Sequence, residues 1–266
     1  MKTQSELNFV GIQLRVQDPE AVSQWLSDTL GMARRSVGPG WKMGWQGCEI
    51  HICKSVEAAP FQEAGEGYYT GLAHIALRSS DLRGAVQLCI QKGIVLAGGQ
   101  EISHNPDIWG PGMDYVNPIC PFGFGLEICQ RLDLPSTPMT LLTDGLEHIG
   151  IPVPEIEQSV EFYQNLGFSK ASSAEIHRAD GKKIYCVMMQ GWGVTLELFE
   201  FAKMGHEPYH DQPFRALLFE SADPESWMKA HPQSCARDAE GVAQVQGPGG
   251  EILMIGKREA RDEFNI

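Results

Sequence analysis

The stretch GLEHIGIPVPEIEQSVEFYQNLGF, residues 145–168, decides how the rest of the chain is interpreted. It begins with an apolar segment typical of a strand and continues through a Pro-Glu turn into an amphipathic helix. Apolar side chains recur there at helical spacing, and Gly167 follows as a helix stop. The ionisable His148 stands at the head of the apolar strand, where the pattern otherwise indicates core.

The same order of segments occurs near the N-terminus, in LNFVGIQLRVQDPEAVSQWLSDTLGM, residues 7–32. There Asp18 suits the N-cap of a helix and Pro19 suits its first position. Weaker copies are GLAHIALRSSDLRGAVQLCIQKG, residues 71–93, and PFRALLFESADPESWM, residues 213–228. Further apolar segments follow each helix, so the sequence predicts an α+β fold of four βαβββ modules.

A connection with two prolines, RLDLPSTPMTLLTD, residues 131–144, divides the four modules into pairs along the chain. We therefore expect two halves, the first over residues 1–133 and the second over residues 141–266, each holding two modules.

Composition limits the kind of partner that the protein binds. The chain has 266 residues, 42% of them hydrophobic, which is enough for a large core. A formal net charge of −13 argues against nucleic acid or a membrane surface as partner. No apolar signal core follows Met1, so we expect a cytoplasmic protein, as a monomer or a homodimer. The seven cysteines form no C-x-x-C pair and are expected to be reduced and mostly buried.

Four ionisable residues occupy matching positions in the second and third modules. His74 and His148 head the first strand of each module, and Glu127 and Glu197 lie in the last strand. Singly, each histidine fits a buried core position and each glutamate fits an exposed strand. Together they offer imidazole nitrogen and carboxylate oxygen, which are ligands for Ni, Zn, Fe, Co or Mn. The sequence therefore predicts a divalent-metal site made of these four residues.

The first and fourth modules have lost this pattern. In the first module, Gly11 stands at the histidine position and His51 at the glutamate position. The two positions are about 50 residues apart in the intact modules and about 40 apart in the altered ones. This spacing predicts that module two pairs with module three, and module one with module four. Sequential pairing is the alternative, and it would combine His51, His74 and Glu127 into the triad of non-haem iron oxygenases.

The chain resembles the vicinal oxygen chelate superfamily in LRVQDPEAVSQWLSDTLGM, GLAHIAL, NPICPFGFGLEI and LEHIGIPVPEIEQSVEFYQNLGF. That superfamily includes glyoxalase I, methylmalonyl-CoA epimerase, extradiol dioxygenases and the bleomycin and fosfomycin resistance proteins. The resemblance covers nearly the whole chain and implies a two-domain member. It implies glyoxalase-like curved sheets, each built from two modules, one of which cups a divalent metal.

Three functions fit the resemblance. The first is a metal-dependent isomerase or lyase of the glyoxalase I or epimerase type, acting on a small substrate with vicinal oxygens. In it, Glu127 would move the proton and Glu197 would stay bound or act as the opposing base. The second is an Fe(II)- or Mn(II)-dependent extradiol-type dioxygenase that uses His51, His74 and Glu127. The third is a non-enzymatic, resistance-type protein that binds a small molecule without metal.

One loop is long enough to matter for such a site. EISHNPDIWGPGM, residues 101–113, places Trp109 among glycines and prolines. A loop of this kind is typical of a cover over a binding site, and equally of a plain surface turn.

Overall fold

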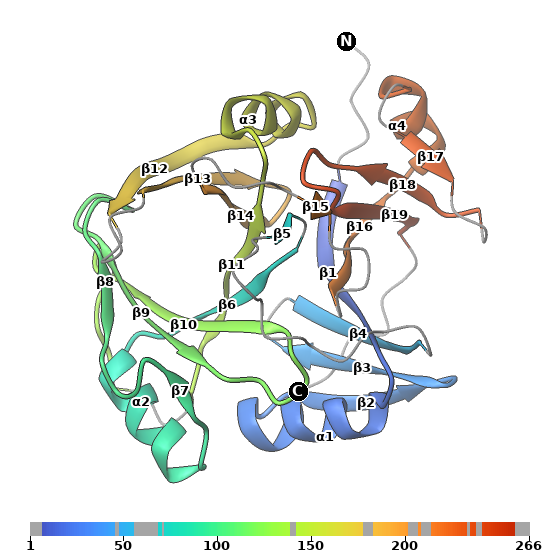
Figure 1. The fold of residues 1–266 in the computed structure, drawn as a ribbon. Coiled ribbons are helices and arrows are strands. Elements are labelled where there is room, and N and C mark those ends of the chain that lie inside the picture. The colour runs from blue at the N-terminus through green and yellow to red at the C-terminus, as the bar shows by residue number, and fades with distance from the viewer. Residues whose placement is uncertain are drawn as a thin grey trace.

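The computed structural model describes residues 7–45, 48–55, 69–70, 72–138, 142–177, 183–201, 207–208, 214–232, 235–237 and 241–258. Their strands form two large curved sheets side by side, and the helices lie on the outside of these sheets (Figure 1). Within these residues, no helix is long and apolar enough to cross a membrane. The predicted α+β class with two cupped sheets is confirmed.

Four modules follow one another along the chain. The first contains β1 (Leu7–Val16), α1 (Pro19–Leu30), β2 (Ala33–Val37), β3 (Gly40–Trp45) and β4 (Cys48–Lys54). The second contains β6 (His74–Arg78), α2 (Leu82–Gln91), β7 (Leu96–Ala97), β8 (Ser103–Asn105), β9 (Met113–Pro118) and β10 (Gly125–Arg131). The third contains β11 (Gly145–Pro152), α3 (Ile156–Asn165), β12 (Ser169–His177), β13 (Lys183–Gly191) and β14 (Val194–Phe201). The fourth contains β16 (Phe214–Ser221), α4 (Pro224–Ala230), β17 (Cys235–Arg237), β18 (Ala243–Gln246) and β19 (Ile252–Lys257). The short strands β5 (Tyr69–Thr70) and β15 (Glu207–Pro208) pair with each other between modules.

Strand order fixes which modules share a sheet. Modules two and three form the nine-stranded sheet β12-β13-β14-β11-β6-β10-β9-β7, with β8 on β9. Modules one and four form the eight-stranded sheet β17-β18-β19-β16-β1-β4-β3-β2. The pairing predicted from the spacings is confirmed, and sequential pairing is wrong. Each sheet takes one module from each of the halves expected at residues 1–133 and 141–266, and that division itself stays a prediction.

A side-chain cap and a glycine set the ends of α1 at the residues that the sequence indicates. The Asp18 carboxylate accepts a hydrogen bond from the Ala21 backbone N–H at 3.0 Å and caps α1, which ends at Gly31 with a φ of 73°. The third module differs, because Glu155 at the N-cap makes no side-chain cap. Instead the Ile156 N–H at the start of α3 donates to the Glu200 carboxylate of β14 at 2.7 Å, which ties helix to sheet.

A contact between α3 and the fourth module joins the two sheets. The Tyr163 hydroxyl on α3 donates to the Glu251 carboxylate, just before β19, at 2.5 Å, and both side chains are buried. Burial raises the pKa of the Glu251 carboxyl to about 7, although hydrogen bonds from Tyr163 and the backbone oppose the rise. The folded protein therefore holds the proton on the Glu251 carboxyl more tightly than the unfolded chain does.

We predict that Glu251→Gln stabilises the protein at pH 8 and has little effect near pH 4. The pKa of the native carboxyl is about 7, against an ordinary value of 4.5. Between these values the folded state binds more protons than the unfolded state, so stability falls as the pH rises from 4.5 to 7. The gain on removing the charge is about 3 kcal/mol, from 1.4 kcal/mol per unit of pKa.

Urea unfolding at pH 5 and pH 8 checks this prediction, with the exposed Glu157→Gln on α3 as the control. Equal changes in the free energy of unfolding at both pH values for Glu251→Gln would contradict it.

Candidate metal centre

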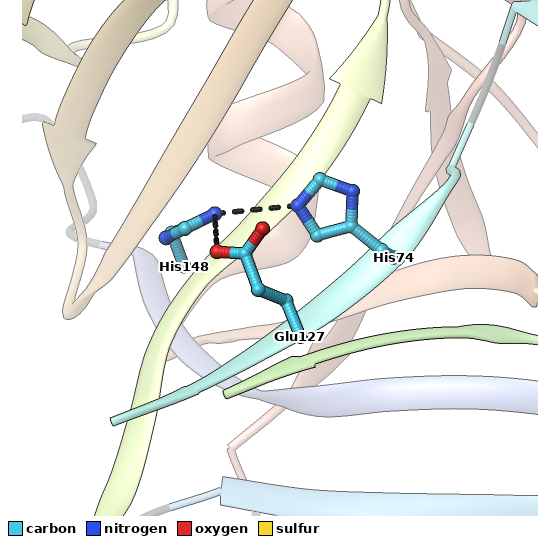
Figure 2. Close-up of side chains that lie close together, drawn as sticks. All are labelled: His74, Glu127 and His148. Atoms are coloured by element: carbon cyan, nitrogen blue, oxygen red, sulfur yellow. Dashed lines mark hydrogen bonds and ion pairs between the residues drawn. The ribbon is translucent and has the colours of Figure 1, made fainter. Parts of the chain in front are cut away.

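The four side chains that the sequence singled out converge on the concave face of the nine-stranded sheet. The Nε2 atoms of His74 and His148 lie 3.3 Å apart, and Glu127 Oε1 lies 3.7 Å from His148 Nε2 (Figure 2). Glu197 Oε2 lies 3.2 Å from His74 Nε2 and 3.3 Å from His148 Nε2. Two imidazoles and two carboxylates thus meet with their ligand atoms within 4 Å of a neighbour.

Strand register explains this convergence. The antiparallel pairing of β6 with β11 places His148 opposite Ala76 and His74 opposite Gly150. The parallel pairings add Glu127 beside Ala76 and Glu197 beside Gly150. Side chains of paired residues point to the same face. The small residues Ala76 and Gly150 leave the space into which the four longer side chains extend.

Burial and the neighbouring charges shift the pKa values of the ionisable groups in this cluster. His148 is fully buried, and Glu127 and Glu197 are each 8% exposed. Burial lowers the pKa of His148, but the nearby carboxylates, Glu197 above all, outweigh it and raise that pKa to about 9. Burial raises the pKa of Glu197, yet the charge and hydrogen bonds of the two imidazoles hold it well below its usual range. For Glu127, burial is the larger effect, and its pKa is raised.

Two buried polar atoms of the cluster lack a hydrogen-bond partner within the described part of the chain. They are Glu127 Oε1 and His148 Nδ1. Unpaired buried carboxylate oxygens are costly unless a cation or a donor satisfies them. A divalent cation between the imidazole Nε2 atoms and the carboxylates would satisfy Glu127 Oε1 and offset the two neighbouring negative charges. The donor set therefore fits a metal ion.

Comparison with known proteins finds a family match over part of the chain and similar folds over most of it. Residues 145–234 match the family model described as "Glyoxalase/Bleomycin resistance protein/Dioxygenase superfamily". Glyoxalase I from Zea mays superposes with a TM-score of 0.64 at 16% identity, over 94% of this chain and 92% of that chain. A putative dioxygenase from Bacillus subtilis superposes with a TM-score of 0.65 at 12% identity, over 97% of this chain and 87% of that chain. The matched segment thus resembles the glyoxalase, bleomycin resistance and dioxygenase superfamily, and the whole chain has the fold of glyoxalase I.

A search of curated protein sequences finds no match. At identities of 12–16% the structural likeness speaks for the fold alone. The chemistry of this protein therefore depends on the residues of its own cluster.

The alternative triad of His51, His74 and Glu127 is wrong. His51 lies on β4 in the eight-stranded sheet, whereas His74 and Glu127 lie on β6 and β10 in the other. The His51 Nε2 atom contacts the Glu49 carboxylate at 2.6 Å instead. Within the described ranges, the group whose ligand atoms all lie within 4.8 Å of one another is His74, Glu127 and His148. Module pairing, which sends modules one and two to different sheets, separates His51 from this group.

Part of the stretch at residues 101–113 forms β8, and the rest packs on the concave face; its role as a cover over a binding site stays a prediction. Ile108 is fully buried there against apolar residues of the sheet, and Trp109 packs on the same cluster. The Trp109 N–H donates to the Ser172 hydroxyl of β12 at 3.0 Å, and its ring lies 3.9 Å from the Arg131 guanidinium. Its φ of 58° is unusual for a residue with a side chain. The loop thus reaches from β8 across to the opposite edge strand.

A cavity of about 590 Å³ lies where β6 and β10 end and β11 begins, and none of the four cluster residues lines it. Arg78, Arg131 and Glu147 are among its lining residues. Arg78 is bound to Asp144 at 2.8 Å, and Arg131 lies 3.7 Å from Glu147. Because each arginine is paired with an acidic group, the cavity offers no unpaired positive charge of these two residues to an anion.

The sequence did not single out the thiols beside the cluster. All seven cysteines are free, as expected, and five are buried. However, the Cys186 thiol donates to Glu197 Oε1 at 3.1 Å, a polar role rather than that of an apolar filler. Only the pairing of β13 with β14 brings the two side chains together, so no spacing rule could have indicated the contact.

We predict that Gly150→Ala moves the His74 ring out of the cluster while the fold is kept. A Cβ atom at Gly150 would overlap the Cε1, Nδ1 and Nε2 atoms of the His74 ring. The ring must turn away, which breaks its contacts with His148 and Glu197. Histidine NMR signals of the variant, or its crystal structure, check this outcome.

Gly256→Ala in β19 is the matched control, since a Cβ atom there meets nothing closer than Phe219 O at 3.8 Å. Unchanged His74 signals in the Gly150→Ala protein would refute the proposed crowding.

Proposed function

We propose that this protein is a metal-dependent isomerase or lyase of the glyoxalase I or epimerase type. Its substrate would be a small molecule with two vicinal oxygens. The observation that carries the proposal is the meeting of two imidazole nitrogens and two carboxylates in one buried cluster. The superfamily fold supports it, because other members of that fold cup a divalent metal in such a sheet.

The ligand set would be His74 Nε2, His148 Nε2, Glu197 Oε2 and Glu127 Oε1. Imidazole and carboxylate ligands suit Ni, Zn, Fe, Co or Mn, and the set alone does not select among them. A bound cation would act as a Lewis acid on the vicinal oxygens of the substrate and make the adjacent C–H more acidic.

The two glutamates are held differently, which supports different roles. Glu197 has the Cys186 thiol on Oε1 and both imidazoles on Oε2. Glu127 lies farther from His148, and its Oε1 accepts no hydrogen bond from the described residues. We assign Glu197 to holding the site. Glu127, the less firmly held carboxylate, is the group that we assign to taking a proton from the substrate carbon and returning it.

A dioxygenase is the second candidate, in an altered form. His74, His148 and Glu127 are themselves two histidines and one carboxylate, the donor set of non-haem iron oxygenases. The Glu197 carboxylate, close to both imidazoles, favours four protein ligands over three. A resistance-type binding protein without metal is the third candidate, and the unpaired Glu127 oxygen argues against it.

We predict that the purified protein binds one divalent cation and that His148→Ala abolishes this binding. The loss follows because His148 Nε2 faces the other three ligand groups. Elemental analysis after reconstitution with Ni²⁺, Zn²⁺, Co²⁺, Mn²⁺ or Fe²⁺ measures the metal content. His51→Ala is the control and should keep full occupancy, because His51 lies in the other sheet.

Metal-free protein after every reconstitution would leave only the binding-protein candidate. Loss of metal in the His51→Ala protein but not in the His148→Ala protein would overturn the ligand set.

We further predict isomerase activity without oxygen consumption. The metal-loaded protein is assayed with the adduct of methylglyoxal and glutathione, and with 2-substituted acyl thioesters, while oxygen uptake is followed with catechols. Glu127→Gln should lower kcat by about 10²–10⁴-fold, the usual contribution of a general base. Oxygen uptake with a catechol, in place of isomerisation, would favour the dioxygenase.

A further inference from the structure

Cys186 lies beside the proposed metal centre, where its thiol can bind one oxygen of the Glu197 carboxylate. It stands on β13, where the register places it opposite Phe199 and places Met188 opposite Glu197. Cys186 and Glu197 are thus diagonal neighbours on the concave face. Both are buried, and the thiol donates to Glu197 Oε1 at 3.1 Å.

This hydrogen bond uses one oxygen of the carboxylate and leaves the other for the imidazoles. Glu197 Oε2 faces both Nε2 atoms, at 3.2 Å from His74 and 3.3 Å from His148. A carboxylate that is free to rotate about its last bond would exchange the two oxygens between these positions. The thiol on Oε1 therefore fixes the plane of the carboxylate.

Apart from the carboxylate, Cys186 has apolar neighbours. The cluster on this part of the concave face contains Met188, Cys129 and Ile108, with Ala174 and Ile176 of β12 packed against it. These side chains carry no strong donor, so loss of the thiol would leave Oε1 buried without its hydrogen bond. A buried carboxylate oxygen in that state reorients or draws in water.

We propose that Cys186 is a positioning residue, whose thiol orients the Glu197 carboxylate so that Oε2 is presented to the metal. The inference rests on the proposed function. Groups of this kind, which bind a ligand residue and not the metal, typically change metal affinity by 10–100-fold when removed. The role differs from that of a core hydrophobe, for which only volume would matter.

The test compares Co²⁺ affinity and the Co²⁺ visible absorption spectrum across single variants. Cys186→Ala should weaken Co²⁺ binding by about tenfold or more in competition with a chelator, and should alter the spectrum, because Glu197 is no longer held. Cys186→Ser restores a donor of similar size and should lie within about threefold of the wild-type affinity. This rescue separates hydrogen bonding from packing.

Cys89→Ala is the control, since Cys89 is a fully buried thiol on α2, away from the cluster. It should leave the Co²⁺ affinity and spectrum unchanged. Circular dichroism confirms folding, and Cys186→Val, which retains volume without a donor, replaces the alanine variant if that protein does not fold.

Wild-type affinity and spectrum in the donor-free variants would overturn the positioning role and leave the proposed function standing. Equal weakening in the serine and alanine variants would also overturn it, because packing alone would then explain the effect. Failure of the wild-type protein to bind Co²⁺ or any other divalent cation would overturn both proposals.

Discussion

The antiparallel pairing of β6 with β11 is the interaction on which the rest of the site depends. It joins modules two and three across the connection between the halves, and it sets His148 opposite Ala76 and His74 opposite Gly150. The parallel neighbours β10 and β14 then add one glutamate each. A slip of one residue in any of these pairings would turn its side chains to the other face of the sheet. Backbone register, more than any side-chain contact, assembles the cluster.

The cluster itself works against the stability of the protein without a cation. Two carboxylates and two imidazoles share a buried space, and the pKa values of Glu127 and Glu197 move in opposite directions because their surroundings differ. Buried charge is expensive, and local rules of packing are most often broken where a protein has a chemical task. Beside it on the concave face lies a cluster of buried apolar side chains, with which the two histidines and two glutamates contrast.

Much of the fold could be predicted because the modules repeat and their helices carry explicit signals. Asp18 and Gly31 bound α1 as expected, and the matching positions of the histidines and glutamates identified the four converging side chains. Edge strands such as β2 and β12 were not singled out, since exposed polar strands resemble loops in sequence. The contacts of Trp109 with Ser172 and of Cys186 with Glu197 were beyond reach. The first joins residues 63 apart in the chain. The second depends on the register between the neighbouring strands β13 and β14, which the sequence did not fix.

Each sheet takes one module from each half of the chain, and this arrangement determines how the two halves are held together. If the chain were cut within residues 131–138, each fragment would carry half of each sheet. One fragment would expose β6 and β1, and the other would expose the edges of β11 and β16, their partners. The two fragments would therefore be joined by two separate strand pairings, β1 with β16 and β6 with β11. Such an architecture lends itself to fragment complementation, with the cluster of histidines and glutamates formed only when both pieces reunite.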